Sequence, residues 1–318
     1  MSPFLIVLIC VLAVLLLVLL ISYVCFYLVF FVPARARNAA RADKYPIPNG
    51  AAYQPYRESI TDFIKRADEL EVREYSIISR DGLTLRAKYY EYEPGAPIEL
   101  MLHGYRGSGR RDLSAGIFRA AALGRSAFVI DHRAAGESDG NIITFGVREK
   151  LDALDWIDFM VKEFGEDVKI LLTGISMGAA TAMLVAAESL PHNVVGVLAD
   201  CGYTSAKEII KKVITDMRLP SNLLYPFVRL GGMIFGGFDA NKADAREAMK
   251  KCRIPIIFYH GDTDDFVPHE MSRENYEACP SRKRFVLIPN AAHGLCYLES
   301  PKLYVDELRN FFKNEFES

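Results

Sequence analysis

Ser176 lies between two glycines, Gly174 and Gly178, at the end of an apolar run. A strand, a tight turn and a helix in that order would push the serine hydroxyl out beyond the carboxyl end of the strand. The glycines permit this because they lack the Cβ atoms that would crowd so sharp a bend. Small, helix-favouring residues follow, and they predict a helix over 177–189. The pattern therefore predicts Ser176 as a nucleophile.

A serine hydroxyl attacks a carbonyl carbon only when a base takes its proton and hydrogen-bond donors meet the oxyanion that forms. Along the chain, Ser176 is followed by several aspartates and then by His293. Serine, acid and histidine in that order can form a catalytic triad. The residue types therefore predict acyl transfer, and we expect neither a metal ion nor another cofactor.

Short apolar runs alternate with segments of helical periodicity through most of the chain. This alternation predicts a mostly parallel sheet with helices on both faces. Two earlier runs, 75–79 and 83–90, are separated by a turn at 80–82 and predict an antiparallel hairpin. The predicted strands are 98–102, 127–130, 168–173, 194–199, 256–259 and 285–288, and the predicted helices between and after them are 113–123, 148–164, 177–189, 269–278 and 302–316.

Polar residues follow most of these predicted strands. Ligands of an open α/β sheet bind beyond the carboxyl ends of the strands, so these are the residues to consider for a site. Besides His293, they are His103, Asp131, His132, Arg133, Asp200, His260, Asp262, Asp264 and Asp265. We expect this edge of the sheet to carry the chemistry.

Five short motifs occur in a fixed order along the chain. They are His-Gly-Tyr at 103–105, Asp-His-Arg-Ala-Ala-Gly-Glu-Ser at 131–138, Gly-Ile-Ser-Met-Gly at 174–178, His-Gly-x-x-Asp-x-x-Val-Pro at 260–268 and Ala-His-Gly at 292–294. With these motifs the sequence resembles the α/β-hydrolase superfamily over about 74–316. Within it, the sequence is similar to membrane-anchored bacterial hydrolases of the prolyl-oligopeptidase-like and serine-aminopeptidase-like group. One position departs from the family pattern, because Ala134 stands where the Asp-x-Arg-Gly motif has glycine.

The resemblance implies an α/β-hydrolase fold with a Ser-Asp-His triad. In it, Ser176 is the nucleophile, Asp264 the acid and His293 the base. The backbone N–H groups of Tyr105 and Met177 would form the oxyanion hole. The departure at Ala134 falls in a motif that is structural in the family, so it leaves this chemistry in place.

The residues alone leave other roles open. One of three other aspartates, Asp200, Asp262 or Asp265, could be the acid. A metal site can also be imagined from the group Asp262, Asp264, Asp265 and His269, but no second ligand group with metal spacing accompanies it. Roles in orienting turns through hydrogen bonds are expected for His103, His132 and His260.

The N-terminal residues 4–32 are uncharged and strongly apolar. As a helix rising about 1.5 Å per residue, this segment exceeds a hydrocarbon core of about 30 Å, so residues 1–32 are predicted to form a single transmembrane anchor. A signal peptide cleaved at 34–36 is the alternative, but the apolar segment is longer than usual and no basic residue precedes it. Four cationic residues follow within 35–44, and the positive-inside bias then places the main domain in the cytoplasm.

The rest of the chain divides into two parts. Residues 33–70 are predicted to be a juxtamembrane linker followed by a helix, and 71–318 the hydrolase domain. An insertion at about 203–250 exceeds what one crossover helix requires and is predicted to be a small helical cap over the Ser176 side of the sheet. Its apolar stretch at 219–238 could line an acyl pocket or pack the cap onto the domain, and its glycine pairs would permit close backbone approach or motion.

Composition narrows the function further. The formal net charge is −2 and no basic stripe occurs, which argues against nucleic acid as a partner. The six cysteines lack C-x-x-C spacing, so we expect unpaired thiols, with Cys201 a buried thiol rather than a nucleophile. We expect a membrane-anchored serine hydrolase that cleaves an ester, thioester or small amide, and the tether and apolar cap favour a lipid-like acyl substrate. A peptidase of the serine-aminopeptidase type and a catalytically silent hydrolase fold used as a binding module are the alternatives.

Overall fold

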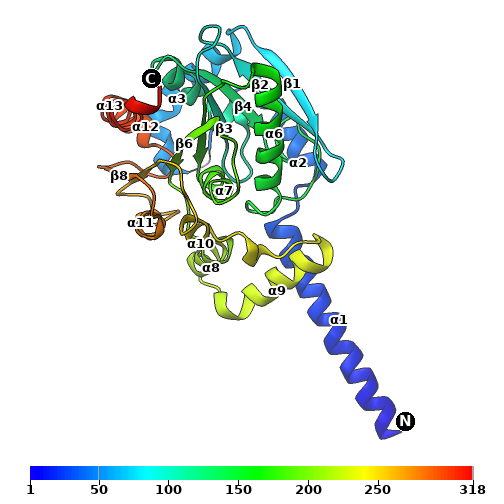
Figure 1. Cartoon of the computed structure of the whole chain (residues 1–318). Coiled ribbons are helices and arrows are strands. Elements are labelled where there is room, and N and C mark those ends of the chain that lie inside the picture. The colour runs from blue at the N-terminus through cyan, green and yellow to red at the C-terminus, as the bar shows by residue number, and fades with distance from the viewer. Residues whose placement is uncertain (49, 317–318) are drawn as a thin grey trace.

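An eight-stranded sheet forms the centre of the computed structural model, which describes residues 1–48 and 50–316 (Figure 1). The strand order is β1-β2-β4-β3-β5-β6-β7-β8. Strands β1 and β2 form an antiparallel hairpin, and β2 also pairs antiparallel with β4. From β4 onward in this order, each strand pairs with the next in parallel. The strands are β1 (Arg73–Ile78), β2 (Thr84–Tyr90), β3 (Ile98–Leu102), β4 (Ser126–Asp131), β5 (Ile170–Ile175), β6 (Val194–Asp200), β7 (Ile256–Gly261) and β8 (Lys283–Ile288). The predicted hairpin and mostly parallel sheet are confirmed, with strand ends displaced by up to two residues.

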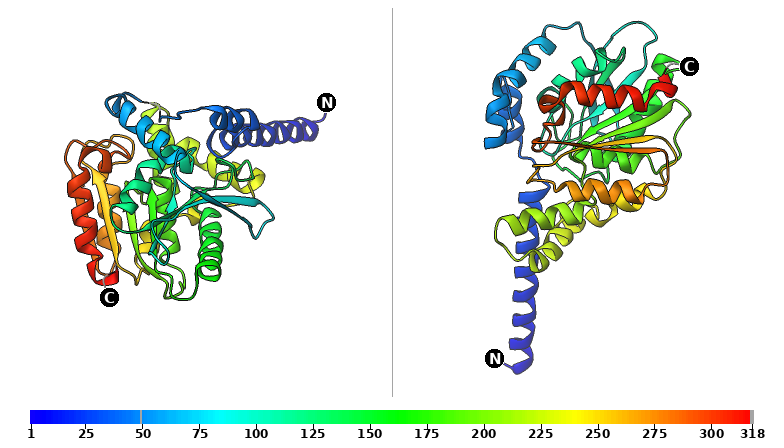
Figure 2. Two further views of the ribbon diagram at one scale, coloured as in Figure 1. Left: turned by 90° about the horizontal axis from the view of Figure 1, so that it is seen from above. Right: turned by 90° about the vertical axis from the view of Figure 1, so that its left-hand side faces the viewer.

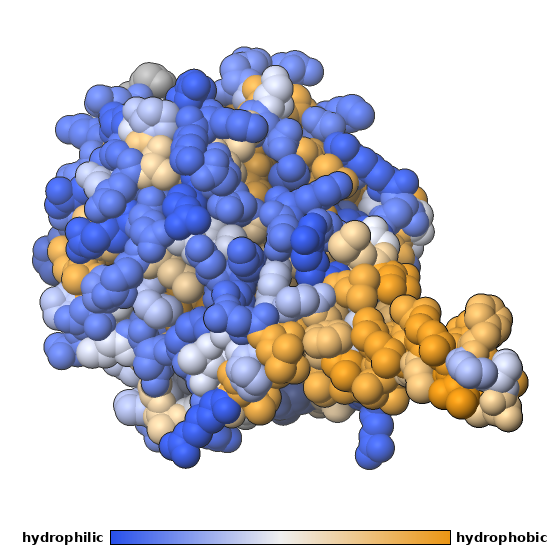
Figure 3. Space-filling view, turned by 90° about the horizontal axis from the view of Figure 1, so that it is seen from below, coloured by the Kyte–Doolittle hydropathy of each residue, from blue (hydrophilic) through white to orange (hydrophobic). Residues whose placement is uncertain are grey.

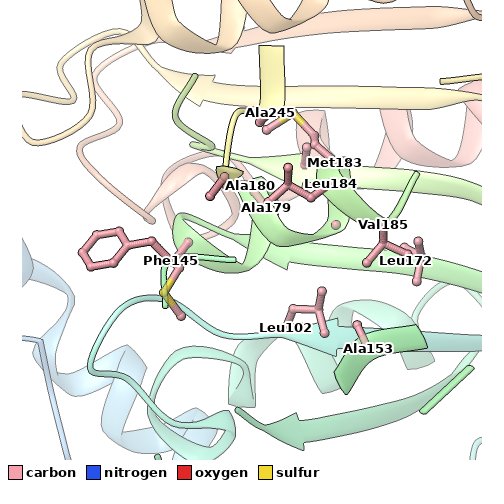
Figure 4. Packing of buried hydrophobic residues seen from close by; sticks show 14 of the residues in the cluster. Leu102, Phe145, Ala153, Leu172, Ala179, Ala180, Met183, Leu184, Val185 and Ala245 are labelled. Carbon is pink, nitrogen blue, oxygen red and sulfur yellow. The ribbon is translucent and has the colours of Figure 1, made fainter. Parts of the chain in front are cut away.

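Helices bury both faces of the sheet, because alternate residues of each strand point to opposite sides. On β5, Leu172 packs with the helices α6 and α7, and Leu171 packs on the other face with α13. Figure 4 shows how closely α7 is held, with the small side chains of Ala179 and Ala180 near the sheet. The domain helices are α4 (Gly109–Asp112), α5 (Ser114–Ala121), α6 (Glu149–Phe164), α7 (Met177–Val185), α10 (Ala245–Met249), α11 (His269–Ala278), α12 (Cys296–Glu299), α13 (Pro301–Phe311) and α14 (Lys313–Phe316).

Helix α1 (Pro3–Val29) projects from the domain (Figure 1). In the described part of the chain it is the one helix that is long and apolar enough to cross a membrane, and its most apolar window is not buried against the protein. Only its last turns touch the rest of the fold, where Ser22 and Phe26 are buried and Phe30 follows in the core. The helix thus presents almost its whole apolar surface to the surroundings.

Residues 33–70, predicted to be a juxtamembrane linker followed by a helix, contain a further helix in the structure. Helix α2 (Ala34–Ala42) follows α1, and a 3₁₀ turn at Ala51–Tyr56 leads into α3 (Arg57–Asp68). Alanine and arginine are strong helix formers, which explains α2 within a segment that looked like a linker. Arg37 and Arg41 of α2 donate hydrogen bonds to the carbonyl oxygens of Gly140 and Gly136, so α2 is fastened to the loop after β4.

The insertion after β6 contains α8 (Ala206–Asp216), α9 (Ser221–Phe235) and a 3₁₀ turn at Ala240–Lys242. Its apolar stretch packs against α1, and not against the Ser176 side of the sheet as predicted. The contact is close because α9 presents glycine there: a Cβ on Gly231 would lie 2.3 Å from the carbonyl oxygen of Ser22. The glycine pair therefore serves close backbone approach, and α9 gains its partner from the N-terminal helix, which local sequence could not indicate.

Candidate active site

Ser176 forms a strained turn between β5 and α7. Its φ is 57° and its ψ is −116°, a backbone conformation that residues other than glycine rarely adopt. The flanking glycines are required: a Cβ on Gly174 would lie 2.2 Å from the carbonyl oxygen of Gly178, and one on Gly178 would lie 2.0 Å from that of Leu102. The predicted strand, turn and helix around Ser176 are therefore present, although α7 ends at Val185, four residues before the predicted end.

Three far-separated side chains meet at the carboxyl edge of the sheet. His293 Nε2 lies 2.9 Å from Ser176 Oγ, and His293 Nδ1 lies 2.7 Å from Asp264 Oδ2. These distances fit a serine O–H that donates to Nε2 and an Nδ1–H that donates to the carboxylate. Ser176 is 8% exposed, so the hydroxyl is shielded but reachable. The arrangement can move a proton from the hydroxyl to the imidazole.

The loop after β7 holds the carboxylate of Asp264 in place. Its Oδ1 accepts hydrogen bonds from the backbone N–H groups of Phe266 (3.0 Å) and Val267 (2.8 Å). Its Oδ2 also lies 3.1 Å from Nε2 of His260, which is itself 2.8 Å from the carbonyl oxygen of Val267. Burial favours the neutral acid, but the hydrogen bonds from His260 and His293 outweigh it and hold the pKa of Asp264 below its ordinary value. The acid is therefore ionised where it contacts His293.

The other candidate acids have different partners. Asp262 Oδ1 accepts the backbone N–H of Asn290 at 2.6 Å, and so fastens the turn that leads toward His293. Asp200 accepts a hydrogen bond from the hydroxyl of Tyr304 at 3.0 Å. Among the described contacts of His293, the carboxylate partner is that of Asp264. The sequence kept these aspartates open as alternatives to Asp264, and the fold separates them.

Of the three histidines expected to orient turns through hydrogen bonds, His103 and His260 do so, but neither ring nitrogen of His132 has a hydrogen-bond partner among the described residues, so this expectation is wrong for His132. His103 accepts the backbone N–H of His132 at 3.0 Å, which ties the end of β3 to the end of β4. His260 contacts both the acid and the loop that presents it, as described above. His269, at the start of α11, has its Nε2 3.5 Å from Oε1 of the neighbouring Glu270. The imagined metal group is not assembled as proposed, because the ligand-type atoms that gather within the described chain are those of Cys201, Asp264 and His293, two of which already bond each other.

The two residues predicted to supply oxyanion donors belong to segments that adjoin Ser176. Met177 is the first residue of α7, where backbone N–H groups have no partner within the helix. The loop with Tyr105 passes close by, because a Cβ on Gly104 would lie 3.5 Å from that of Ser176. The Tyr105 hydroxyl donates to the carbonyl oxygen of Val29 at 2.6 Å, so this loop is also tied to the end of α1.

A cavity of about 510 Å³ opens at Ser176 and His293. No residue of the insertion 203–250 is among the described residues that line it, so of the two roles considered for its apolar stretch the lining of an acyl pocket does not hold. One wall comes instead from the juxtamembrane segment, with Ile60, Phe63 and Ile64 of α3. Tyr53 from the same segment donates its hydroxyl to the carbonyl oxygen of His293 at 3.0 Å. The segment that follows α1 thus completes the site.

The inner part of the cavity contains charge. Arg119, Asp200 and Tyr304 line it. Arg119 pairs with the fully buried Glu99, which Arg125 also contacts at 3.0 Å. Burial alone would raise the pKa of Glu99, but the positive charges of Arg119 and Arg125 outweigh this effect and lower it. This cluster fixes α5 to β3 beneath the apolar part of the cavity.

Comparison with known proteins identifies the fold. Residues 100–231 match a family model described as alpha/beta hydrolase fold. The esterase Pf2001 of Pyrococcus furiosus superposes with a TM-score of 0.63 at 22% identity, over 79% of this chain and 94% of that chain. The chain has the α/β-hydrolase fold. The acylaminoacyl peptidase of Pyrococcus horikoshii shares the fold with a TM-score of 0.58 at 16% identity, over 78% of this chain and 43% of that one.

Sequence relatives of this α/β-hydrolase-fold chain are distant. The uncharacterized protein YqkD of Bacillus subtilis is 26% identical over 193 residues, which span 60% of this chain and 63% of the relative. Protein bem46 of Schizosaccharomyces pombe is 24% identical over 71% of this chain and 72% of its own length. The uncharacterized membrane protein YNL320W of Saccharomyces cerevisiae is 25% identical over 85% of this chain and 90% of its own. At the position where the motif has glycine, Ala134 adopts φ 62°, a backbone conformation that glycine adopts more readily.

Proposed function

We propose that this protein is a membrane-anchored serine hydrolase that cleaves an ester, thioester or small amide through an acyl-serine intermediate. The observation that carries the proposal is the continuous hydrogen-bonded series from Ser176 through His293 to Asp264. A strained turn and a buried carboxylate are both costly, and together they are typical of a site built for nucleophilic catalysis.

In the proposed reaction, Ser176 Oγ attacks the carbonyl carbon while its proton passes to Nε2 of His293. The carbonyl π electrons move to the oxygen, which receives hydrogen bonds from the N–H groups of Tyr105 and Met177. As the tetrahedral intermediate collapses, the bond to the leaving alcohol, thiol or amine breaks and the imidazolium protonates it. A water molecule then attacks the acyl-serine with His293 as base, which releases the acid and restores the serine. Asp264 holds the imidazole tautomer throughout.

The cavity and the anchor support a lipid-like acyl substrate. Next to Ser176, apolar side chains from α3 and β5 line the space, which suits a hydrocarbon chain better than a peptide. Helix α1 would hold the site beside a bilayer, and the basic residues of 35–44 favour the cytoplasmic side for the domain by the positive-inside bias. The segment that links α1 to the domain also forms the wall of the cavity, so anchoring and substrate access share one structural element.

The first test is hydrolysis of p-nitrophenyl esters of graded acyl length by the full chain in detergent or vesicles. We expect turnover that increases with chain length, and loss of turnover in Ser176→Ala. Ser126→Ala is the matched control, because this buried serine lies at the amino end of β4, the opposite edge of the sheet. Aminoacyl amides are included because one structural neighbour is an acylaminoacyl peptidase. A folded protein that cleaves neither class would favour the binding module instead.

A further inference from the structure

Helix α9 carries an apolar stripe that the domain does not cover. Leu223, Phe227, Leu230 and Ile234 follow each other at intervals of four, three and four residues, so they share one face of the helix. Leu223 is 63% exposed and Ile234 is 49% exposed, and the two between them are half-buried. The opposite face is buried, with Tyr225 and Val228 turned toward the fold. A stripe of this kind on a soluble surface needs a partner.

The C-terminal end of α9 contacts α1 near Ser22. Gly231 lies against Ser22 and Phe26, and the ring of Phe235 lies 5.2 Å from that of Tyr23 in an edge-to-face arrangement. In Figures 1 and 2, α9 runs across α1 and not along it. The level of Ser22 along α1 is therefore the level at which α9 crosses it.

The length of α1 places that level at the surface of a bilayer. The helix has 27 residues, and about 20 of them are enough to cross the hydrocarbon core. Counted from Pro3, the crossing ends near Ser22, and Tyr23 and Tyr27 follow it at the depth where aromatic residues are favoured. Figure 3 shows the apolar surface of the projecting helix continuing onto the underside of the domain.

We propose that α9 is a second membrane-contacting element, which lies in the plane of the same bilayer with the stripe of Leu223, Phe227, Leu230 and Ile234 at the boundary of headgroups and acyl chains. The proposal rests on the membrane anchoring in the proposed function. Lys207 and Lys211 of α8 line a small groove beside α9 and supply positive charge for anionic headgroups, whereas Arg229 of α9 is already paired with Asp239. Two points of attachment would stop the domain from rotating about α1 and so fix the direction in which the catalytic cavity faces.

Tryptophan fluorescence in vesicles tests this placement in the full chain. The sequence has one tryptophan, Trp156, which is fully buried in the core and gives a constant background. Ile234→Trp and, separately, Leu223→Trp add an indole to the stripe. Leu303→Trp adds one to α13, where the native side chain is 41% exposed, as the matched control. Vesicles of brominated phosphatidylcholine should quench roughly half of the added emission from the stripe, because the indole would contact acyl chains, and should leave Leu303→Trp unchanged.

A further variant, Leu12→Trp, reports on the anchor itself. If Leu12→Trp is quenched while both stripe variants behave like Leu303→Trp, the proposed docking of α9 is wrong and the anchoring stands. If none is quenched, the anchoring fails and the docking fails with it. Labelling of the active serine by a fluorophosphonate is measured on the same samples and decides the catalytic proposal separately.

Discussion

Replacement of Asp264 by asparagine should remove most of the activity without disturbing the loop that carries it. The asparagine oxygen can still accept the backbone N–H groups of Phe266 and Val267, which now bind Oδ1. Its NH₂ group then takes the place of Oδ2 and faces Nδ1 of His293, and the contact of Oδ2 with Nε2 of His260 is lost while that nitrogen keeps the carbonyl oxygen of Val267. Because an NH₂ group can only donate, Nδ1 must accept, and the proton moves to Nε2. The imidazole then has no lone pair to take the proton of Ser176.

A wrong tautomer of this kind lowers kcat by about 10⁴-fold in serine hydrolases with the same geometry. At about 1.4 kcal/mol per factor of ten, this corresponds to roughly 5.5 kcal/mol of transition-state stabilisation. The assay is the initial rate of p-nitrophenyl ester hydrolysis, with thermal unfolding of each variant measured in parallel. KM should change little, since the acid does not contact the substrate.

Asp262→Asn is the matched control. Asp262 lies two residues away on the same loop, and the asparagine oxygen can keep the hydrogen bond from Asn290 N–H. We expect this variant to keep nearly full activity. The reasoning is refuted if Asp264→Asn retains more than about a tenth of the wild-type kcat, a loss of less than 1.4 kcal/mol, or if Asp262→Asn loses as much as Asp264→Asn.

Three further predictions concern the surroundings of the triad. Tyr53→Phe removes a hydrogen bond to the carbonyl oxygen of His293 worth about 1 kcal/mol, so kcat should fall by up to about fivefold in the same ester assay. Glu99→Ala leaves two buried arginines without their carboxylate and should cost about 3–5 kcal/mol, seen in calorimetry as a midpoint lower by roughly 10 °C; an unchanged midpoint would contradict it. The pKa of Asp264 is lower in the folded protein than its ordinary value of 3.8, so at acidic pH the unfolded chain takes up the proton first. The ionised carboxylate therefore contributes to the free energy of unfolding above about pH 3.8, and this contribution is lost as the pH falls toward the folded pKa. Urea midpoints of Asp264→Asn should therefore fall less between pH 5 and pH 3 than those of wild type.

The features predictable from the sequence are those that local chemistry determines. Gly174 and Gly178 permit one unusual turn, so the placement of Ser176 between strand and helix could be foreseen. Buried parallel strands are continuous apolar runs, and β3 has the predicted ends because its run is bounded by polar turns.

The choice of the acid needed more than residue types. Asp262 and Asp264 occupy the same loop and have the same chemistry, and the residues alone could not rank them. What separates them is the path of the backbone, which directs Asp264 toward His293 and Asp262 toward Asn290. The resemblance to a family supplied this distinction, and the geometry is consistent with it.

The cavity wall and the cap could not be predicted, because both depend on long-range packing. The apolar positions of α3 indicated a helix laid on the domain, but not that Ile60 and Phe63 would face the site. The insertion was expected near Ser176 because it follows β6, yet the glycines of α9 fit the backbone of α1 at Ser22. Such pairings between segments some 200 residues apart leave no periodic signal in either one.

The most direct test of the central claim is to treat the full chain with a fluorophosphonate and to locate the adduct by peptide mass spectrometry. The account predicts a single modified residue, Ser176, with labelling lost in Ser176→Ala and strongly slowed in His293→Ala. An active, folded protein whose adduct maps to another residue, or whose ester hydrolysis persists in Ser176→Ala, would contradict it.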